Sequence, residues 1–384
     1  MSETQVPELL IDVYDNRVRA GAFVSAAAAL ALQFCFPPTT ERKASKRSTI
    51  WILLAVILGV NGVVAFLLWE SWDAIKARKA ADPGYPDWWH LVIALYSFAV
   101  LTASRVALVP LFQRLGDALI ARDKDKREMR VQRFAGQLWK VLFHGAMTAI
   151  PMYVLHGQPF WPPGFGDAHV IFERYPHTPQ IKYLREFYMV QLGYYLHAFV
   201  ATLLQRGRPN IVEMTVHHMA TLALVFVSYF VQNAVRFGAL VLWVHDVCDV
   251  PVSFTRVVVD LSWILPIAVS YLLLMVSWVV FRLYVFPVRL IYIASYSCFT
   301  TGAVPFSEAY GWIPLLGLLY TLVVMHWKWF FELAGMGKTY LATGVRVDST
   351  EATAEDLKAA TEGRTRTDAS KEKKTAKKKS AKRD

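Results

Sequence analysis

The chain has 384 residues, of which 55% are hydrophobic and 14% aromatic, and it carries a net charge of +11. Its mean hydropathy is +0.32, and the apolar residues gather in runs of roughly twenty, the length that crosses a bilayer as a helix. These values exclude one or two soluble domains and indicate an all-α, polytopic integral membrane helix bundle. The three cysteines are scattered without a CxxC pair, so no disulfide framework can be inferred.

Nine apolar runs follow one another along the chain and are interpreted as candidate spans. The stretch from Leu261 to Thr301 is too long for a single pass and contains Pro287, which disfavours a continuous helix. Residues 284–305 are therefore expected to form a re-entrant or interfacial segment, and the bundle is expected to have seven to nine spans. The candidate spans are 20–36, 50–69, 88–110, 134–155, 184–204, 211–231, 237–257, 261–283 and 311–334.

Basic residues predict the orientation of these spans, because short cytoplasmic loops are enriched in Lys and Arg. They crowd residues 41–47, 114–133 and 206–208 and the C-terminal tail. Nine alternating spans place all four groups in the cytoplasm and the N-terminus on the opposite side. The loop 157–182, rich in aromatic residues and proline, then lies outside the cytoplasm.

The C-terminal region, residues 337–384, is predicted to be a disordered polybasic cytoplasmic tail. Its last fourteen residues, KEKKTAKKKSAKRD, cannot bury a hydrophobic core. Behind so many apolar spans, contact with an anionic membrane leaflet is favoured over nucleic-acid binding, and no nucleic-acid partner is expected. Residues 1–129 are predicted to hold the N-terminal spans and a charged cytoplasmic linker.

Two successive spans carry the ionisable residues that indicate a functional site. His217 and His218 lie about two turns into the sixth candidate span, and the seventh carries His245, Asp246 and Asp249. Insertion scales give a cost on the order of 2.5–3.5 kcal/mol for an aspartate at the centre of a membrane helix. The two spans are antiparallel neighbours with a short connection, so these groups are expected at similar depth and facing one another.

The chemistry of this group favours acid–base or covalent catalysis. Adjacent histidines point about 100° apart on a helix, so one is expected to meet substrate and the other to face the carboxylates. Thr221 shares a helix face with both. An aspartate that accepts from one imidazole N–H leaves the other nitrogen to act as base or nucleophile. Polar contacts that only join helices are a second interpretation. A metal site is a third, but adjacent histidines rarely chelate one ion, and no metal is expected.

Other polar residues within the spans have weaker functional interpretations. His197 and His326 lie among aromatic residues, and packing is the favoured role for each. Arg105 and His144 are expected to be structural or to extend toward the membrane surface.

Three arginines have two open interpretations each. Arg282 either anchors a helix end or functions in the site. Arg206 and Arg208, just before the histidine span, either set the topology or contact an anionic phosphate group at the mouth of a pocket.

The region 186–261 resembles the core of the ceramide synthases, the enzymatic branch of the TLC-domain superfamily. HHMAT at 217–221 is similar to the HHxxT of that family, and HDVCD at 245–249 is similar to its HDxxD. RLYVFP at 282–287 and HWKW at 326–329 are further similarities. The two histidine motifs at this spacing, in consecutive spans, make the resemblance specific, and it covers about 130–336.

The resemblance implies a six-helix TLC core at 130–336 that encloses an intramembrane pocket in the endoplasmic reticulum membrane. It implies transfer of an acyl group from acyl-CoA, a co-substrate, to the amine of a sphingoid base, without a further cofactor. Direct and two-step transfer, and homo- or hetero-oligomerisation, remain open. The implied catalytic residues are His217, His218, Asp246 and Asp249, and the implied substrate-binding residues are Thr221, His245, Arg206, Arg208, Arg282 and His326.

Two features depart from the family pattern. Pro251 follows the HDxxD motif closely, and Arg256 stands where a lysine is common in the family, so this helix is expected to end or kink early. The loop 297–311, at the position associated in the family with acyl-chain choice, identifies no chain length. A non-enzymatic TLC-fold protein that binds lipid or acts as a scaffold is the alternative function.

Overall fold

The computed structural model describes residues 46–343, except 83, 123–126, 164, 165, 167, 205–209, 262, 301 and 306–308. The regular secondary structure of this part is entirely helical, which confirms the predicted all-α class. The candidate span 20–36, Arg206, Arg208 and the tail beyond 343 lie outside the described residues. The long helices are α2 (Lys46–Ala81), α3 (His90–Leu119), α4 (Arg127–Val154), α5 (Leu184–Leu204), α6 (Ile211–Phe230), α7 (Val235–Leu261), α8 (Ile264–Ser277) and α10 (Ala309–Thr343).

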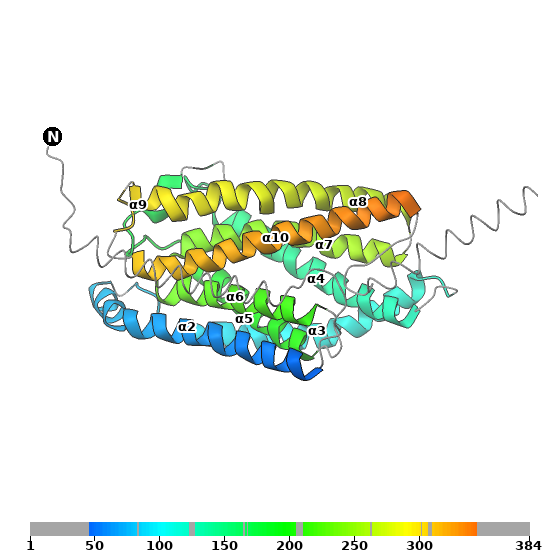
Figure 1. The fold of residues 1–384 in the computed structure, drawn as a ribbon, viewed down its shortest axis with the longest axis horizontal. Coiled ribbons are helices and arrows are strands. Elements are labelled where there is room, and N and C mark those ends of the chain that lie inside the picture. The colour runs from blue at the N-terminus through cyan, green and yellow to red at the C-terminus, as the bar shows by residue number, and fades with distance from the viewer. Residues whose placement is uncertain are drawn as a thin grey trace, which may run out of the picture.

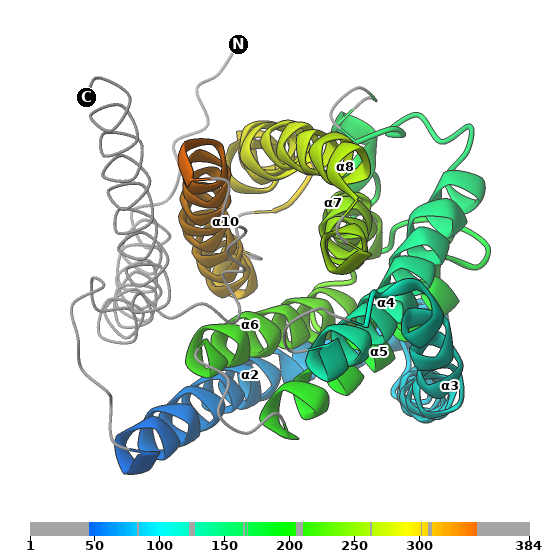
Figure 2. The same cartoon turned by 90° about the vertical axis from the view of Figure 1, so that its right-hand side faces the viewer.

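Six helices close into a ring, the number predicted for the core. Following the contacts around it, α4 packs on α7, α7 on α8, α8 and its continuation on α10, α10 on α6, α6 on α5, and α5 on α4. Figure 2 shows this arrangement nearly end-on. Helix α2 packs against α6, and α3 packs against α4 and α5, so these two helices lie outside the ring.

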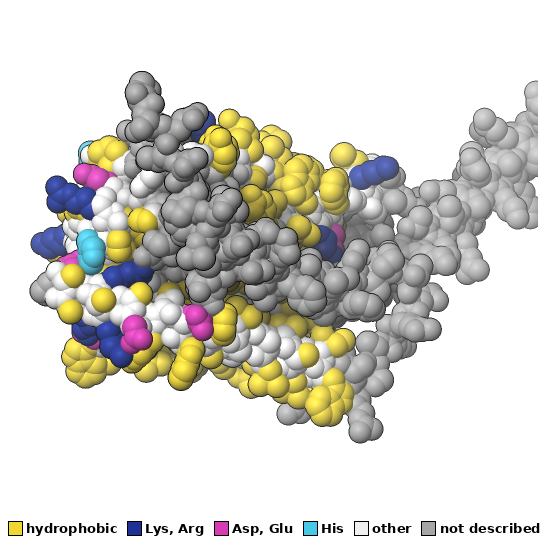
Figure 3. All heavy atoms as spheres, turned by 60° about the vertical axis from the view of Figure 1, so that its left-hand side comes forward, with side chains coloured by type: hydrophobic (Ala, Val, Ile, Leu, Met, Phe, Trp, Pro, Cys, Tyr) yellow, Lys and Arg dark blue, Asp and Glu magenta, His cyan; other side chains and the backbone are white. Residues whose placement is uncertain are grey.

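The side chains of the outer helices indicate a lipid environment. Seven helices of the described chain are long and apolar enough to cross a membrane. In the most apolar window of α2 only 6% of residues are buried, against 61% in α6 and 67% in α7. In Figure 3 hydrophobic side chains cover the long sides of the bundle, whereas most charged side chains lie at its left end. The chain is therefore a multi-pass membrane protein, in which the ring helices bury their side chains against one another and the outer helices expose theirs to lipid.

Helix α4 is the most polar of the ring helices and is not among these seven candidate spans. It was predicted from 134 to 155 and runs from Arg127 to Val154. Gln137, Lys140 and His144 recur at spacings of three and four and line one cavity together. Part of the polarity of α4 therefore lies on the face that it turns toward this cavity.

The prediction of a separate segment at 284–305 is wrong. Helix α8 continues without interruption through η2 (Trp278–Ile291), η3 (Ile293–Ser297) and α9 (Cys298–Thr300). η2 is a π-helix that contains Pro287. Membrane helices accommodate proline through such local π adjustments, which satisfy the backbone groups that the ring leaves free. One long helix thus replaces the predicted span and segment.

Pro251 likewise fails to interrupt its helix, since α7 extends through it to Leu261. Helix α10 extends to Thr343, several residues into the region predicted as tail. The described long helices alternate in direction, so the start of α2 and the end of α10 lie toward the same end of the bundle, on the right in Figure 1.

Candidate active site

Two cavities meet inside the ring. The inner cavity, about 60 Å³, is mainly apolar. The outer cavity is larger, about 290 Å³, and its lining includes Arg, Lys, Glu and four histidines. The two linings share four residues, which therefore mark the junction between an apolar and a polar compartment: Tyr195, His217, Asp249 and Arg282.

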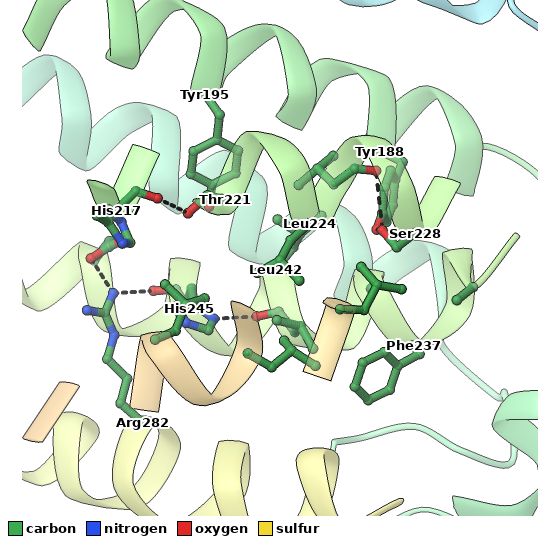
Figure 4. A pocket seen from close by; sticks show the side chains of 18 of the residues that line it. Tyr188, Tyr195, His217, Thr221, Leu224, Ser228, Phe237, Leu242, His245 and Arg282 are labelled. Atoms are coloured by element: carbon green, nitrogen blue, oxygen red, sulfur yellow. Dashed lines mark hydrogen bonds and ion pairs between the residues drawn. The ribbon is translucent and has the colours of Figure 1, made fainter. Parts of the chain in front are cut away.

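The inner cavity extends from this junction between α5, α6, α7 and α10. Figure 4 shows His217, His245 and Arg282 at one end and Phe237 toward the other, with Leu224 and Leu242 between them. The only hydroxyl pair drawn there joins Tyr188 to Ser228, at 2.5 Å. A lining of this composition suits an apolar chain whose polar head stays at the junction.

His217 is the member of the histidine pair that faces both compartments. Its side chain is half-buried, and its buried Nδ1 has no hydrogen-bond partner within the described residues. The Thr221 hydroxyl donates to the His217 carbonyl oxygen at 2.9 Å, so it contacts the backbone and leaves the imidazole available. His218 lines the outer cavity. The expected division of roles, in which one ring meets substrate and the other faces the carboxylates, stays a prediction.

Trp329 supports the His217 ring from α10, with ring centroids 5.2 Å apart in an edge arrangement. Its indole N–H donates to Glu213, and Lys328 pairs with the same carboxylate at 2.6 Å. Glu213 therefore joins α6 to α10 one turn before His217. The HWKW motif contributes to the site through this contact.

Asp249 pairs with an arginine rather than with an imidazole. Arg282 Nη2 donates to Asp249 Oδ1 at 2.6 Å and to the His245 carbonyl oxygen at 3.3 Å. The guanidinium also lies over the Trp278 ring, 4.3 Å from its centroid. Arg282 comes from the π-helix η2, so this pair joins η2 to α7 at the junction of the cavities. Its functional interpretation was open, and the geometry places it in the site.

Asp246 does not pair with His217 or His218 as expected. His144 Nδ1 donates to Asp246 Oδ1 at 2.8 Å, and the Gln191 amide donates to the other carboxylate oxygen. His144 Nε2 then accepts from the Tyr194 hydroxyl at 2.9 Å. Asp246 is fully buried and lines neither cavity, whereas His144 and Tyr194 line the outer one. His144 was expected to be structural or to extend toward the membrane surface, and the polar residues at spacings of three and four on α4 were the signal that could have placed it here.

Asp246→Asn is expected to destabilise the bundle. Both carboxylate oxygens accept from donors, so the NH₂ of asparagine must face either His144 or Gln191, which also donate. Loss of a buried hydrogen bond to a charged group costs about 1.5–3 kcal/mol. Thermal melting of the purified protein in detergent measures this. Asp117→Asn removes an exposed carboxylate that pairs with Arg127 and should melt like wild type; equal melting of both variants would contradict the assignment.

His245 and His326 form a ring pair, with centroids 4.9 Å apart. His245 Nδ1 donates to the Val241 carbonyl oxygen at 2.7 Å, which leaves Nε2 with the lone pair and without a partner among described residues. His245 lines the inner cavity, but His326 lines neither. The geometry therefore places His326 behind His245. Within the described part of the chain, no three His, Cys, Asp or Glu side chains are grouped as metal ligands.

Comparisons with known proteins show the family to which the chain belongs. The TLC domain matches residues 133–334. Ceramide synthase 1 of Homo sapiens is 30% identical over 250 residues, which are 62% of this chain and 68% of the human protein. ASC1-like protein 1 of Oryza sativa subsp. japonica is 27% identical over 274 residues, 67% of this chain and 85% of that protein. Ceramide synthase LOH1 of Arabidopsis thaliana is 25% identical over 286 residues, 68% and 88% of the two chains. The chain therefore belongs to the TLC-domain family of ceramide synthases.

Proposed function

We propose that this protein transfers a fatty acyl group from acyl-CoA to the amine of a sphingoid base and produces ceramide or dihydroceramide. One observation carries the proposal: His217 lies where an apolar cavity meets a polar one. An acyl thioester has the same division, since its chain is apolar and its CoA part is polar. The chain enters the inner cavity, and the thioester carbon is held beside the imidazole.

The reaction needs a base, because a sphingoid amine is mostly protonated near neutral pH. The His217 imidazole takes this proton and releases it to solvent, and the neutral amine nitrogen attacks the thioester carbonyl. As the C–S bond breaks, the nitrogen loses a second proton to the imidazole, which passes it to the sulfur, so that CoA leaves as the thiol. In the alternative two-step route the imidazole first accepts the acyl group and then passes it to the amine. Both routes use the same position of His217.

Arg282 supplies the charge that this reaction needs. Its Nε is buried and has no hydrogen-bond partner within the described residues, while Nη2 holds Asp249. An N–H donor at the junction stabilises the oxyanion that forms on the thioester carbonyl. Asp249 keeps the guanidinium in place and compensates its charge before the substrate binds.

The outer cavity supports a cytoplasmic entrance for CoA. Its lining includes Asn210 and Met214 at the start of α6 and Arg256 near the end of α7. Helix α10 also ends at this end of the bundle, and the excess of Lys and Arg in the sequence that follows is typical of the cytoplasmic side. The endoplasmic reticulum membrane is the proposed location.

The test is product formation by the purified protein from a long-chain sphingoid base and a panel of acyl-CoAs, followed by mass spectrometry. N-acyl product supports the proposal, and the panel identifies the acyl length. A wild-type protein that is folded but inert with every acyl-CoA would overturn it and favour a lipid-binding scaffold.

A further inference from the structure

The outer cavity contains more positive charge than the proposed chemistry at His217 requires. Three cations line it besides Arg282, and each comes from a different helix: Arg105 from α3, Lys140 from α4 and Arg256 from α7. Arg256 lies seven residues after Asp249 on α7, which is about 10 Å along the axis at 1.5 Å per residue. This places it well outward of the reacting groups.

The carboxylates that line the same cavity already have cationic partners. Glu213 and Glu332 both pair with Lys328, at 2.6 and 2.9 Å. Asp249 pairs with Arg282 at 2.6 Å. No ion pair of Arg105 or Arg256 with a carboxylate occurs among the described residues, so these two charges are not compensated by the lining of the cavity.

The Arg105 guanidinium is held in place by the neutral imidazole of His197 rather than by a carboxylate. The Thr102 hydroxyl donates to the Phe98 carbonyl oxygen at 2.7 Å, so its oxygen accepts from His197 Nδ1 at 2.9 Å. His197 Nε2 then has a lone pair and accepts from Arg105 Nη1 at 3.4 Å. The guanidinium also lies over Trp139, 6.0 Å from the ring centroid. This chain of bonds orients the guanidinium and leaves its charge available to an anion.

We propose that Arg105 and Arg256, with Lys140, form an anion site that binds the phosphate groups of the nucleotide half of acyl-CoA. The inference rests on the proposed function and adds where the co-substrate is held. Guanidinium groups bind phosphates through two parallel N–H donors. The pantetheine arm separates these phosphates from the thioester, which agrees with the position of Arg256 outward of Asp249.

The experiment compares an acyl-CoA with the S-acyl-pantetheine of the same chain, which lacks the nucleotide and its phosphates. Arg105→Gln, Arg256→Gln and the double variant are measured beside Arg114→Gln, a control on α3 whose side chain is exposed and lines neither cavity. For each arginine removed we expect KM for acyl-CoA to rise about tenfold, the effect of one charge-assisted hydrogen bond. KM for acyl-pantetheine should not change.

An equal rise with both substrates, or no rise with either, would overturn the anion site. If Arg105→Gln has a lower melting temperature than wild type, the test uses Arg256→Gln alone. This substitution should not destabilise the protein, because the Arg256 side chain has no ion pair among the described residues. Binding of free CoA and of 3′-dephospho-CoA, measured by calorimetry, separates this inference from the proposed function. A protein that makes no ceramide but binds CoA, with weaker binding in the double variant, keeps the anion site and loses the proposed reaction. A double variant that makes ceramide with an unchanged KM for acyl-CoA keeps the proposed reaction and loses the anion site.

Discussion

His217→Ala should reduce N-acyltransferase activity by about 10²–10⁴-fold, the contribution typical of a positioned acid–base group. The physical reason is that His217 alone of the histidine pair lines both the apolar and the polar cavity. The measurement is the initial rate of ceramide formation at saturating substrates, with melting temperature as the check on folding. His156→Ala provides the matched control, because His156 is exposed and lines neither cavity.

His218→Ala distinguishes the two members of the pair. Its ring lines the outer cavity, so its loss should weaken activity less than the loss of His217. A folded His217→Ala protein with near wild-type rate would show that the reacting group is elsewhere. If His218→Ala were the inactive variant, the two roles would have to be exchanged.

Asp249→Asn should be the most destabilising single change at the site, and more so than Arg282→Gln. Asparagine leaves a guanidinium whose side chain is only 5% exposed and that cannot lose its proton. Removal of one partner from a buried ion pair costs about 3–5 kcal/mol. Arg282→Gln leaves Asp249, which is 29% exposed and can take up a proton, so its cost is smaller. Thermal melting in detergent gives the order of the two variants.

The double variant Asp249→Asn, Arg282→Gln should regain most of the stability and remain inactive, because no buried charge remains and the oxyanion donor is lost. Asp73→Asn is the control, since it breaks an exposed pair with Lys76 that contributes little. A double variant that is as unstable as Asp249→Asn would show that packing, rather than charge, explains the loss.

Most of the fold was predictable because hydropathy and helical periodicity are local properties. The spans at 184–204 and 211–231 agree with α5 and α6 within a residue. The largest errors involve proline. Pro251 and Pro287 were expected to interrupt helices, yet both helices continue through them. Neighbouring helices and a π-helical stretch compensate for the missing N–H, and neither can be inferred from the residues around the proline.

The sequence by itself determined which residues are candidates for the chemistry. The two motifs, their spacing in consecutive spans and the cost of burying their side chains place His217 and Asp249 in one site without any coordinates. The position of His217 on its helix, two turns from the start, follows from counting residues.

Only the tertiary structure decided how these groups are paired. Asp246 binds His144, 102 residues away, and Asp249 binds Arg282, 33 residues away. Arg105 and His197 are 92 residues apart. Each partner is on another helix, and the rotation of a helix about its axis depends on how its surface packs against its neighbours. The sequence of one helix gives the groups on each face, but the ring of six helices decides which face meets which.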